Sequence, residues 1–266
     1  MTFIEKLEKQ ISVSQSYLCV GLDPDWAKIP EHLPRTQEGL LVFLQEIVKK
    51  TQDSAAAFKP NFAFFEALGP TGMEVLQEII RSIPQQIPVI GDAKRGDVGH
   101  TAQLYARAAF ETFGCDAVTV TPYQGEDSLR PFFDYHDRGI FVLCLTSNAG
   151  AVDFQLPELH LEVARKVNEW NVSANAGLVV GATRPENIAA IRKVSGQMPY
   201  LIPGVGAQGG ELKGTLISAE DGTKIPYLIN ASRSILYAST SEDYALKAGE
   251  AAKNLKDQIN LCHSNL

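Results

Sequence analysis

The sequence has few cysteines and no excess of positive charge, and these shortages exclude several classes of protein. It has four cysteines in 266 residues, and no two of them form a C-x-x-C pair. We therefore expect reduced thiols in a cytoplasmic protein rather than a disulfide framework. The net charge of -7 argues against a surface of clustered lysine and arginine for nucleic-acid phosphates, so we expect no nucleic-acid partner.

Long apolar runs and metal-binding spacings are also missing. No apolar run reaches the length of a membrane span, and the first ten residues carry Glu5 and Glu8 without the apolar region of a secretory signal. None of the five histidines lies in an H-x-H or H-E-x-x-H arrangement, and no cysteine joins them. We therefore expect no membrane association and no required metal.

Short apolar segments, each followed by a helical pattern, are what the sequence does contain. Hydrophobic residues make up 45% of the chain and charged residues 21%, as in ordinary soluble enzymes. We predict strands at residues 17–22, 55–58, 87–90, 117–120, 140–145, 177–180, 200–202 and 227–229, and a closing helix at residues 244–259. Strands that alternate with helices pair in parallel, so eight such units predict an α/β fold, a closed (β/α)8 TIM barrel.

A doubly wound open sheet is the alternative fold. Polar residues follow many of the predicted strands, whereas an open sheet concentrates its ligand groups at one switch point, so the barrel is favoured. No linker, low-complexity tract or internal repeat interrupts residues 1–266, and we expect a single domain. Phe3, Ile4, Leu7 and Ile11 recur at helical spacing and predict a short N-terminal helix that caps the fold.

The stretch Asp92-Ala93-Lys94-Arg95-Gly96-Asp97 sets two acids around a lysine where a predicted strand turns into a helix. Asp92 and Lys94 are two residues apart and should project to the same side of the strand, while Asp97 is expected to open the helix. Two acids beside one amine keep it protonated, which makes it a poor nucleophile and a good proton donor. An ordinary surface ion-pair cluster is the alternative at this point.

Other predicted strand ends add polar groups to the same face of a barrel. Asp23 follows the first strand and Lys59 the second, although each alone could form a loop salt bridge or a helix cap. Thr146, Ser147 and Asn148 follow the fifth strand and offer amide and hydroxyl groups for the edge of a planar heterocycle. A simple turn is the alternative for these three residues.

Glycine-rich sequence after the seventh strand predicts a phosphate site. Loops after strands seven and eight bind phosphate in this fold through backbone N–H groups, and an arginine there would add a bidentate contact. Gly204, Gly206 and Gly209 also match the dinucleotide pattern G-x-G-x-x-G, but the βαβ unit and the acid that this fingerprint requires are missing. Phosphate is therefore favoured over NAD, with a flexible surface loop as the alternative.

In this order the motifs resemble those of the orotidine 5′-phosphate decarboxylase family, specifically its longer bacterial-type branch with the DAKRGD motif. The similarity runs from Leu18 to Tyr237, and it rests on Gly21-Leu22-Asp23, Phe58-Lys59-Pro60-Asn61, Asp92 to Asp97, Thr146-Ser147-Asn148, Pro203 to Gly210, and Ser232-Arg233. The resemblance implies an enzyme that decarboxylates orotidine 5′-monophosphate to uridine 5′-monophosphate (UMP) and CO2, the last step of de novo pyrimidine biosynthesis. The resemblance implies no cofactor. The sequence resembles the stand-alone enzyme rather than the fused synthase.

The resemblance also implies roles for individual residues. The charged catalytic array would be Lys59, Asp92, Lys94 and Asp97. Asp23 and Lys59 would bind the ribose, and Ser147 or Asn148 would bind the pyrimidine edge. Asn61 and Thr101 are also implied in substrate binding. The residues expected around the phosphate are Pro203, Gly204, Gly206, Gln208, Ser232 and Arg233. Asp97 and Thr101 would reach across the interface of a homodimer and complete the neighbouring site.

The implied reaction agrees with the chemistry of these side chains. Loss of CO2 from C6 leaves a localised carbanion, which a protonated Lys94 can stabilise and then protonate. Phosphate binding is expected to help by closing residues 207–226, whose glycines permit a hinge. A metal-dependent phosphosugar lyase with the same barrel and a catalytically silent nucleotide-binding barrel are the alternatives.

Overall fold

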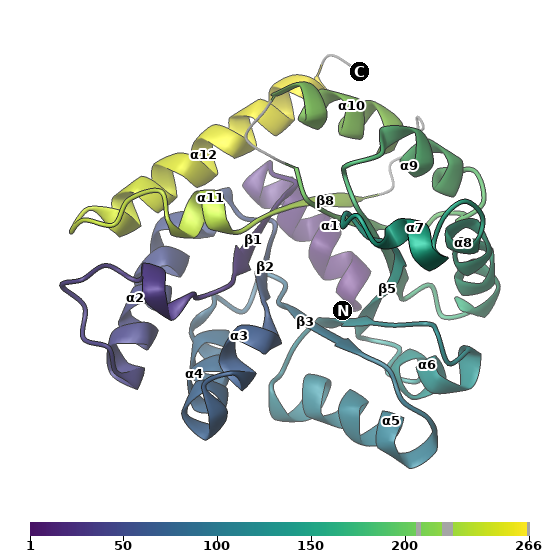
Figure 1. The fold of residues 1–266 in the computed structure, drawn as a ribbon, viewed down its shortest axis with the longest axis horizontal. Helices are drawn as coiled ribbons and strands as arrows, with labels where there is room; N and C mark the ends of the chain where they lie inside the picture. The colour runs from purple at the N-terminus through teal and green to yellow at the C-terminus, as the bar shows by residue number, and fades with distance from the viewer. Residues whose placement is uncertain (206–208, 220–225, 265–266) are drawn as a thin grey trace.

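The chain forms a barrel of eight parallel strands surrounded by helices (Figure 1). The computed structural model describes residues 1–205, 209–219 and 226–264. Its strands are β1 (Leu18–Leu22), β2 (Ala57–Pro60), β3 (Ile90–Arg95), β4 (Ala117–Val120), β5 (Gly139–Leu145), β6 (Ala176–Val180), β7 (Tyr200–Pro203) and β8 (Tyr227–Ala231). They are hydrogen-bonded in the order β2-β1-β8-β7-β6-β5-β4-β3, and isolated bridges from Phe58 to Val89 and from Asn61 to Asp92 bring β2 to β3. The predicted TIM barrel is confirmed.

Helices precede, connect and follow the strands, and most of them cover the outside of the barrel (Figure 1). They are α1 (Phe3–Ser14), α2 (Gln37–Thr51), α3 (Phe62–Glu66), α4 (Gly69–Ser82), α5 (Gly99–Arg107), α6 (Glu126–Phe133), α7 (Ala151–Phe154), α8 (Leu159–Trp170), α9 (Pro185–Arg192), α10 (Gly209–Ala219), α11 (Arg233–Leu236) and α12 (Tyr244–His263). Two short 3-10 helices, η1 (Trp26–Lys28) and η2 (Gln52–Ser54), and a π-helix, η3 (Ala108–Thr112), complete the set. Within the described ranges, no helix is both long and apolar enough to cross a membrane.

The strands are almost wholly apolar because they are buried on both faces. In β1, for example, Leu18, Val20 and Leu22 pack against the outer helices, whereas Cys19 belongs to a separate cluster inside the barrel. Side chains alternate between the two faces of a strand, so every second residue points into the lumen. This alternation decides which polar residues can reach a site inside the barrel.

Helix α1 closes the end of the barrel at which the strands begin (Figure 1). Thr2 and Glu5 form a capping box at its start, and its Phe3 and Leu7 are buried in the inner cluster. The Phe3 ring meets the Phe141 ring edge to face, with 5.7 Å between centroids, and a side chain at Gly139 would overlap with Phe3. Because Phe3 and Leu7 of α1 fill the lumen at this end, a substrate can enter the lumen from the end at which the strands finish.

Two strands begin and end later in the sequence than predicted. Strand β2 ends at Pro60 and β3 at Arg95, so Lys59, Asp92 and Lys94 lie within strands and not after them. The sequence did not predict these strand ends, because only the apolar N-terminal part of each strand matches a strand pattern and the C-terminal part carries charged residues. The expectation that Asp97 opens the next helix is wrong, since α5 begins at Gly99 with Val98 as its N-cap.

Candidate active site

Lys59, Asp92 and Lys94 form one charged cluster inside the C-terminal mouth of the barrel. Lys59 Nζ lies 2.6 Å from Asp92 Oδ2, and Lys94 Nζ lies 2.5 Å from Asp92 Oδ1. Each lysine therefore binds a different oxygen of one carboxylate. The Lys59 and Asp92 side chains are 5% and 10% exposed, but that of Lys94 is 49% exposed. Lys94 is consequently the member of the cluster that an incoming ligand can reach.

The electrostatics of the cluster favour charged side chains in spite of burial. Burial alone would raise the pKa of Asp92, but the positive charges of Lys59 and Lys94 outweigh it and hold that pKa well below its usual range. Burial likewise opposes the charged form of Lys59, yet the negative charges of Asp92 and Asp23 raise its pKa. Asp92 is therefore ionised and Lys59 protonated at neutral pH.

Thr119 in β4 is a member of this cluster that the sequence analysis missed. Its Oγ1 donates to Asp92 Oδ1 at 3.0 Å and accepts from the backbone N of Lys94 at 2.9 Å. Lys94 has a left-handed backbone, with φ of 47°, and the pairing of β3 with β4 is irregular between Gly91 and Arg95. Thr119 thus fixes the carboxylate and the irregular strand together. The sequence signal that could have indicated Thr119 is that it is the polar residue in an otherwise apolar strand.

Asp23 lies beside the cluster at the end of β1, in a loop that Tyr237 holds in place. The Tyr237 hydroxyl donates to the backbone O of Asp23 at 2.8 Å and accepts from the backbone N of Asp25 at 2.5 Å. Burial raises the pKa of Tyr237 to about 12, so the hydroxyl keeps its proton. Asp23 is half-buried, and its Oδ1 has no hydrogen-bond partner in the described part of the chain.

Asn61, Asp97 and Thr101 are not drawn into the charged cluster. Asn61 Oδ1 accepts from the backbone N of Ala63 and caps α3. Asp97 Oδ1 accepts from the backbone N of Val98 at 2.8 Å, and Thr101 is exposed on α5. Among the described residues, none of the three forms an ion pair or a side-chain hydrogen bond with the cluster.

Ser147 and Asn148 follow β5 on the side of the mouth opposite β1. Asn148 Oδ1 accepts from Thr146 Oγ1 at 2.6 Å, so part of its carboxamide is engaged within its own loop. Ser147 is exposed and lies against two glycines, because side chains at Gly181 or Gly204 would come within 2.8 Å and 3.2 Å of it. This close approach of three loops leaves Ser147 as the freer polar group.

The predicted phosphate residues are only partly described. Pro203 ends β7, and Gly204 follows it with φ of +89°, a conformation that favours glycine. Ser232 and Arg233 follow β8; Ser232 lies so close to Gly21 that a side chain there would overlap with it, and Arg233 is exposed without an ion pair to any described residue. Gly206 and Gln208 lie outside the described residues, as do residues 207–208 and 220–225 of the segment expected to close.

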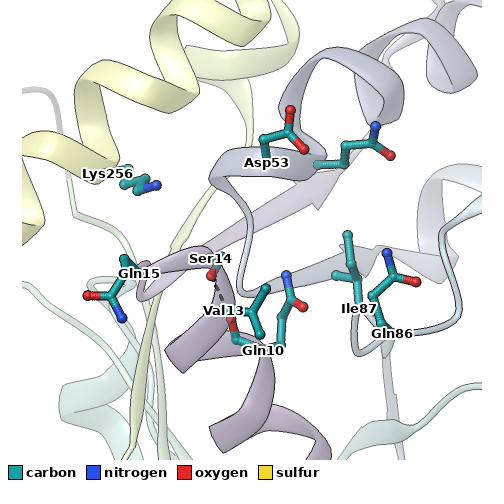
Figure 2. Close-up of a pocket in the computed structure, with 9 residues that line it drawn as sticks. Gln10, Val13, Ser14, Gln15, Asp53, Gln86, Ile87 and Lys256 are labelled. Atoms are coloured by element: carbon teal, nitrogen blue, oxygen red, sulfur yellow. Dashed lines mark hydrogen bonds between the residues drawn. The ribbon is translucent and has the colours of Figure 1, made fainter.

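A cavity of about 520 Å³ lies on the opposite side of the barrel, where the strands begin. It is lined by Gln10, Val13, Ser14, Gln15, Gln52, Asp53, Gln86, Ile87 and Lys256 (Figure 2). Ser14 Oγ donates to the backbone O of Gln10 across its wall at 2.7 Å. None of the predicted site residues lines it, and this face of a TIM barrel serves stability in known enzymes. The candidate site is therefore the charged mouth, not this cavity.

The three buried cysteines are not nucleophiles, and the described ranges hold no ready-made metal site. Burial raises the pKa of Cys19, Cys115 and Cys144 to about 12, so these thiols are inert. No group of three or more His, Cys, Asp or Glu residues able to hold a metal ion occurs in those ranges. The groups that the described part of the mouth offers are lysine ammonium groups, carboxylates and hydroxyls.

Known proteins of one family are similar to this chain over nearly its whole length. Residues 16–248 match the family described as "Orotidine 5'-phosphate decarboxylase / HUMPS family". An orotidine 5′-phosphate decarboxylase from Janthinobacterium sp. (strain Marseille) is 46% identical over 267 residues, covering 98% of each chain. The structure of Leishmania donovani OMP decarboxylase has a TM-score of 0.86 and 38% identity over 98% of both chains, and that of L. donovani UMP synthase has a TM-score of 0.88 and 40% identity over 98% of this chain and 56% of the other. The chain belongs to the orotidine 5′-phosphate decarboxylase / HUMPS family.

Proposed function

We propose that the protein decarboxylates orotidine 5′-monophosphate to UMP and CO2. The observation that carries this proposal is the charged Lys59–Asp92–Lys94 cluster at the open mouth of a barrel of this family. Relatives at about 46% identity over nearly the whole chain bear the name of this enzyme. The reaction needs positive charge at one carbon atom, and the cluster offers it.

Lys94 is the proposed proton donor because its ammonium group is the exposed end of the cluster. The bond from C6 to the carboxylate breaks, its electron pair stays on C6, and CO2 leaves. The nearby ammonium group stabilises that localised charge and transfers a proton from Nζ to C6. The neutral amine then regains a proton from water. Asp92 holds Lys94 in place through Oδ1 at 2.5 Å.

Asp92 is proposed to act on the substrate carboxylate through like charge. It is ionised, and its two oxygens are fixed by Lys59, Lys94 and Thr119. A second carboxylate placed beside it is repelled, whereas the attraction of Lys94 grows as charge moves from the carboxylate to C6. Only interactions that strengthen toward the transition state accelerate the reaction. Lys59 provides the fixed countercharge that keeps Asp92 ionised.

The placement of the strand ends supports a proposal for where each part of the substrate lies. Asp23 and Lys59 lie on β1 and β2 and are proposed to hold the ribose. Ser147 is proposed for the pyrimidine edge because Asn148 is engaged with Thr146. Phosphate is assigned to Pro203, Gly204, Gly206, Gln208, Ser232 and Arg233 after β7 and β8, and Asn61 supports the ribose side of the mouth.

A second copy of the chain is the proposed partner. Asp97 and Thr101 lie next to the mouth without contacting the cluster, and the same stretch exposes two apolar side chains, Val98 at 51% and Leu104 at 41%. A homodimer would cover this surface and bring Asp97 and Thr101 to the neighbouring site. We also propose one domain for residues 1–266 and a cytoplasmic location, in keeping with its four free cysteines.

The proposed function is tested by following the ultraviolet absorbance of orotidine 5′-monophosphate after addition of purified protein. We expect the absorbance to fall, UMP to form in equal amount to the substrate lost, and a chelator to leave the rate unchanged. A rate that disappears with chelation, together with activity on a phosphosugar, would instead support the metal-dependent lyase. Nucleotide binding with a flat absorbance trace would support a silent binding protein.

A further inference from the structure

Asn230 in β8 is a buried carboxamide inside the barrel for which the proposed function gives no role. It is 9% exposed, and its Oδ1 has no hydrogen-bond partner among the described residues. Its neighbours Ile229 and Ala231 pack in the outer core, while Leu228 belongs to the inner cluster. The alternation of side chains therefore places Asn230 in the lumen, one step closer to the mouth than Leu228.

The Asn230 carboxamide reaches the floor of the candidate site because Gly21 has no side chain. A Cβ atom at Gly21 would lie 3.3 Å from Asn230 Oδ1. Gly21 pairs with Lys59 on the adjacent strand, so Asn230 lies across β1 from the charged cluster. Two residues beyond Gly21, Asp23 Oδ1 is a second buried acceptor without a partner in the described part of the chain.

Two buried acceptors without donors at neighbouring strand ends need an explanation, because buried polar groups are nearly always hydrogen-bonded. Asn175 also has an unpartnered Oδ1, but its Nδ2 donates to the backbone O of Phe133, Tyr135 and Arg138, which accounts for its burial. The Asn230 side chain makes no hydrogen bond with any described residue. Its position is explained if a ligand in the mouth supplies the donor.

The proposed substrate has few donors to offer. Its phosphate and carboxylate carry only acceptors at neutral pH, so its donors are two ribose hydroxyls and one ring N–H. The ring edge is assigned to Ser147 after β5, and β5 lies across the barrel from β1. The ribose, with hydroxyls on adjacent carbons, matches two acceptors on adjacent strands.

We propose that Asn230 Oδ1 accepts a hydrogen bond from one ribose hydroxyl while Asp23 Oδ1 accepts from the other. Asn230 is thus a positioning residue that makes the site selective for a ribonucleotide with an intact vicinal diol. This inference rests on the proposed function, because the diol belongs to the proposed substrate and product. Strands β1 and β8 together would hold the sugar while the ring lies over the charged cluster.

Calorimetric titration with UMP, 2′-deoxy-UMP and 3′-deoxy-UMP tests this inference. For Asn230→Ala we expect UMP to bind about tenfold more weakly, as for the loss of one hydrogen bond. One of the two deoxy analogues, the one lacking the hydroxyl bound by Asn230, should bind the variant and the wild type equally. Equal weakening of all three ligands, or no weakening of any, would overturn the inference.

Two further variants separate selectivity from folding. Asn230→Leu keeps the branched shape of the side chain without the acceptor, and we expect the same ligand-specific loss. Asn175→Ala removes a carboxamide that lies where the chain enters β6, and we expect a lower melting temperature with unchanged ratios among the three ligands. A wild type that neither binds UMP nor decarboxylates the substrate would refute the proposed function itself. A wild type that does both but binds all three nucleotides alike would refute only the role of Asn230.

Discussion

Asp92→Asn removes the central charge of the cluster while preserving the size of the side chain. Lys59 is 4% exposed, and Asp92 is its ion-pair partner at 2.6 Å. Removing one partner of a buried pair destabilises a protein by about 3–5 kcal/mol, because the other charge stays buried. Asparagine keeps one acceptor oxygen, so we expect about 3 kcal/mol. In a chain of this size that loss lowers the melting temperature by about 6–12 °C.

The pH dependence of this loss identifies the charge that is responsible. In the wild type the pKa of Lys59 is raised, so its contribution is present below the pKa of an unfolded lysine and is lost as pH rises through the folded value. In the variant, burial without Asp92 lowers the pKa of Lys59, and stability therefore increases as pH rises toward about 10. At alkaline pH the difference in unfolding free energy between the two proteins should therefore shrink, because the wild type loses stability while the variant gains it. It should also shrink below the pKa of an unfolded aspartate, about 3.9, because the pKa of Asp92 is lowered in the folded wild type and its contribution is lost as pH falls toward that folded value.

Urea unfolding followed by circular dichroism at about pH 3, 7 and 9.5 measures these differences. Asp25→Asn is the matched control: Asp25 pairs with Lys28 at 3.0 Å on the surface, and its loss should leave stability unchanged at each pH. An Asp92→Asn variant as stable as the wild type at pH 7 would refute the account of a buried, mutually dependent charge cluster. So would a loss that stays constant up to pH 9.5.

Three further predictions concern the partner subunit and the loops. Mixing equal amounts of inactive Asp97→Ala and Lys94→Ala chains should restore about a quarter of wild-type activity, because half of the dimers are mixed and each holds one intact site; no recovery would contradict a shared site. Gly204→Ala places a side chain at φ of +89° and 3.2 Å from Ser147, so KM should rise at least about tenfold, and an unchanged KM in steady-state assays would exclude this loop from binding. Tyr237→Phe frees the loop after β1 from its hydroxyl, so KM should rise more than kcat falls; a change in kcat alone would contradict a positioning role.

Most strands could be predicted because each is a short apolar run between polar connections. Strand β4 was predicted at its observed bounds, and β5 to β8 to within two residues at either end. Strands β2 and β3 were placed too early because their last residues are charged and face the lumen. Functional charge at a strand end looks like the start of a loop in the sequence, and only closure of the barrel shows that Lys59 and Asp92 belong to the ladder.

The candidate site could be predicted where residue type and spacing carried the information. Asp92 and Lys94 were expected on one side of a strand, and they share an ion pair. Thr119, Asn230 and the tether from Tyr237 depend on contacts between strands distant in sequence, which spacing does not reveal. For Thr119 and Asn230, the sequence held only a weak signal, a polar residue inside an apolar strand.

The most direct test of the central claim is the steady-state rate of Lys94→Ala on orotidine 5′-monophosphate, measured beside its affinity for UMP. The account predicts that kcat falls by at least about 100-fold, as for loss of a general acid, because Lys94 is the exposed ammonium of the cluster. UMP should still bind with Kd within about threefold of wild type, since Asp23, Ser147 and the phosphate residues remain. Undiminished turnover by Lys94→Ala would contradict the account.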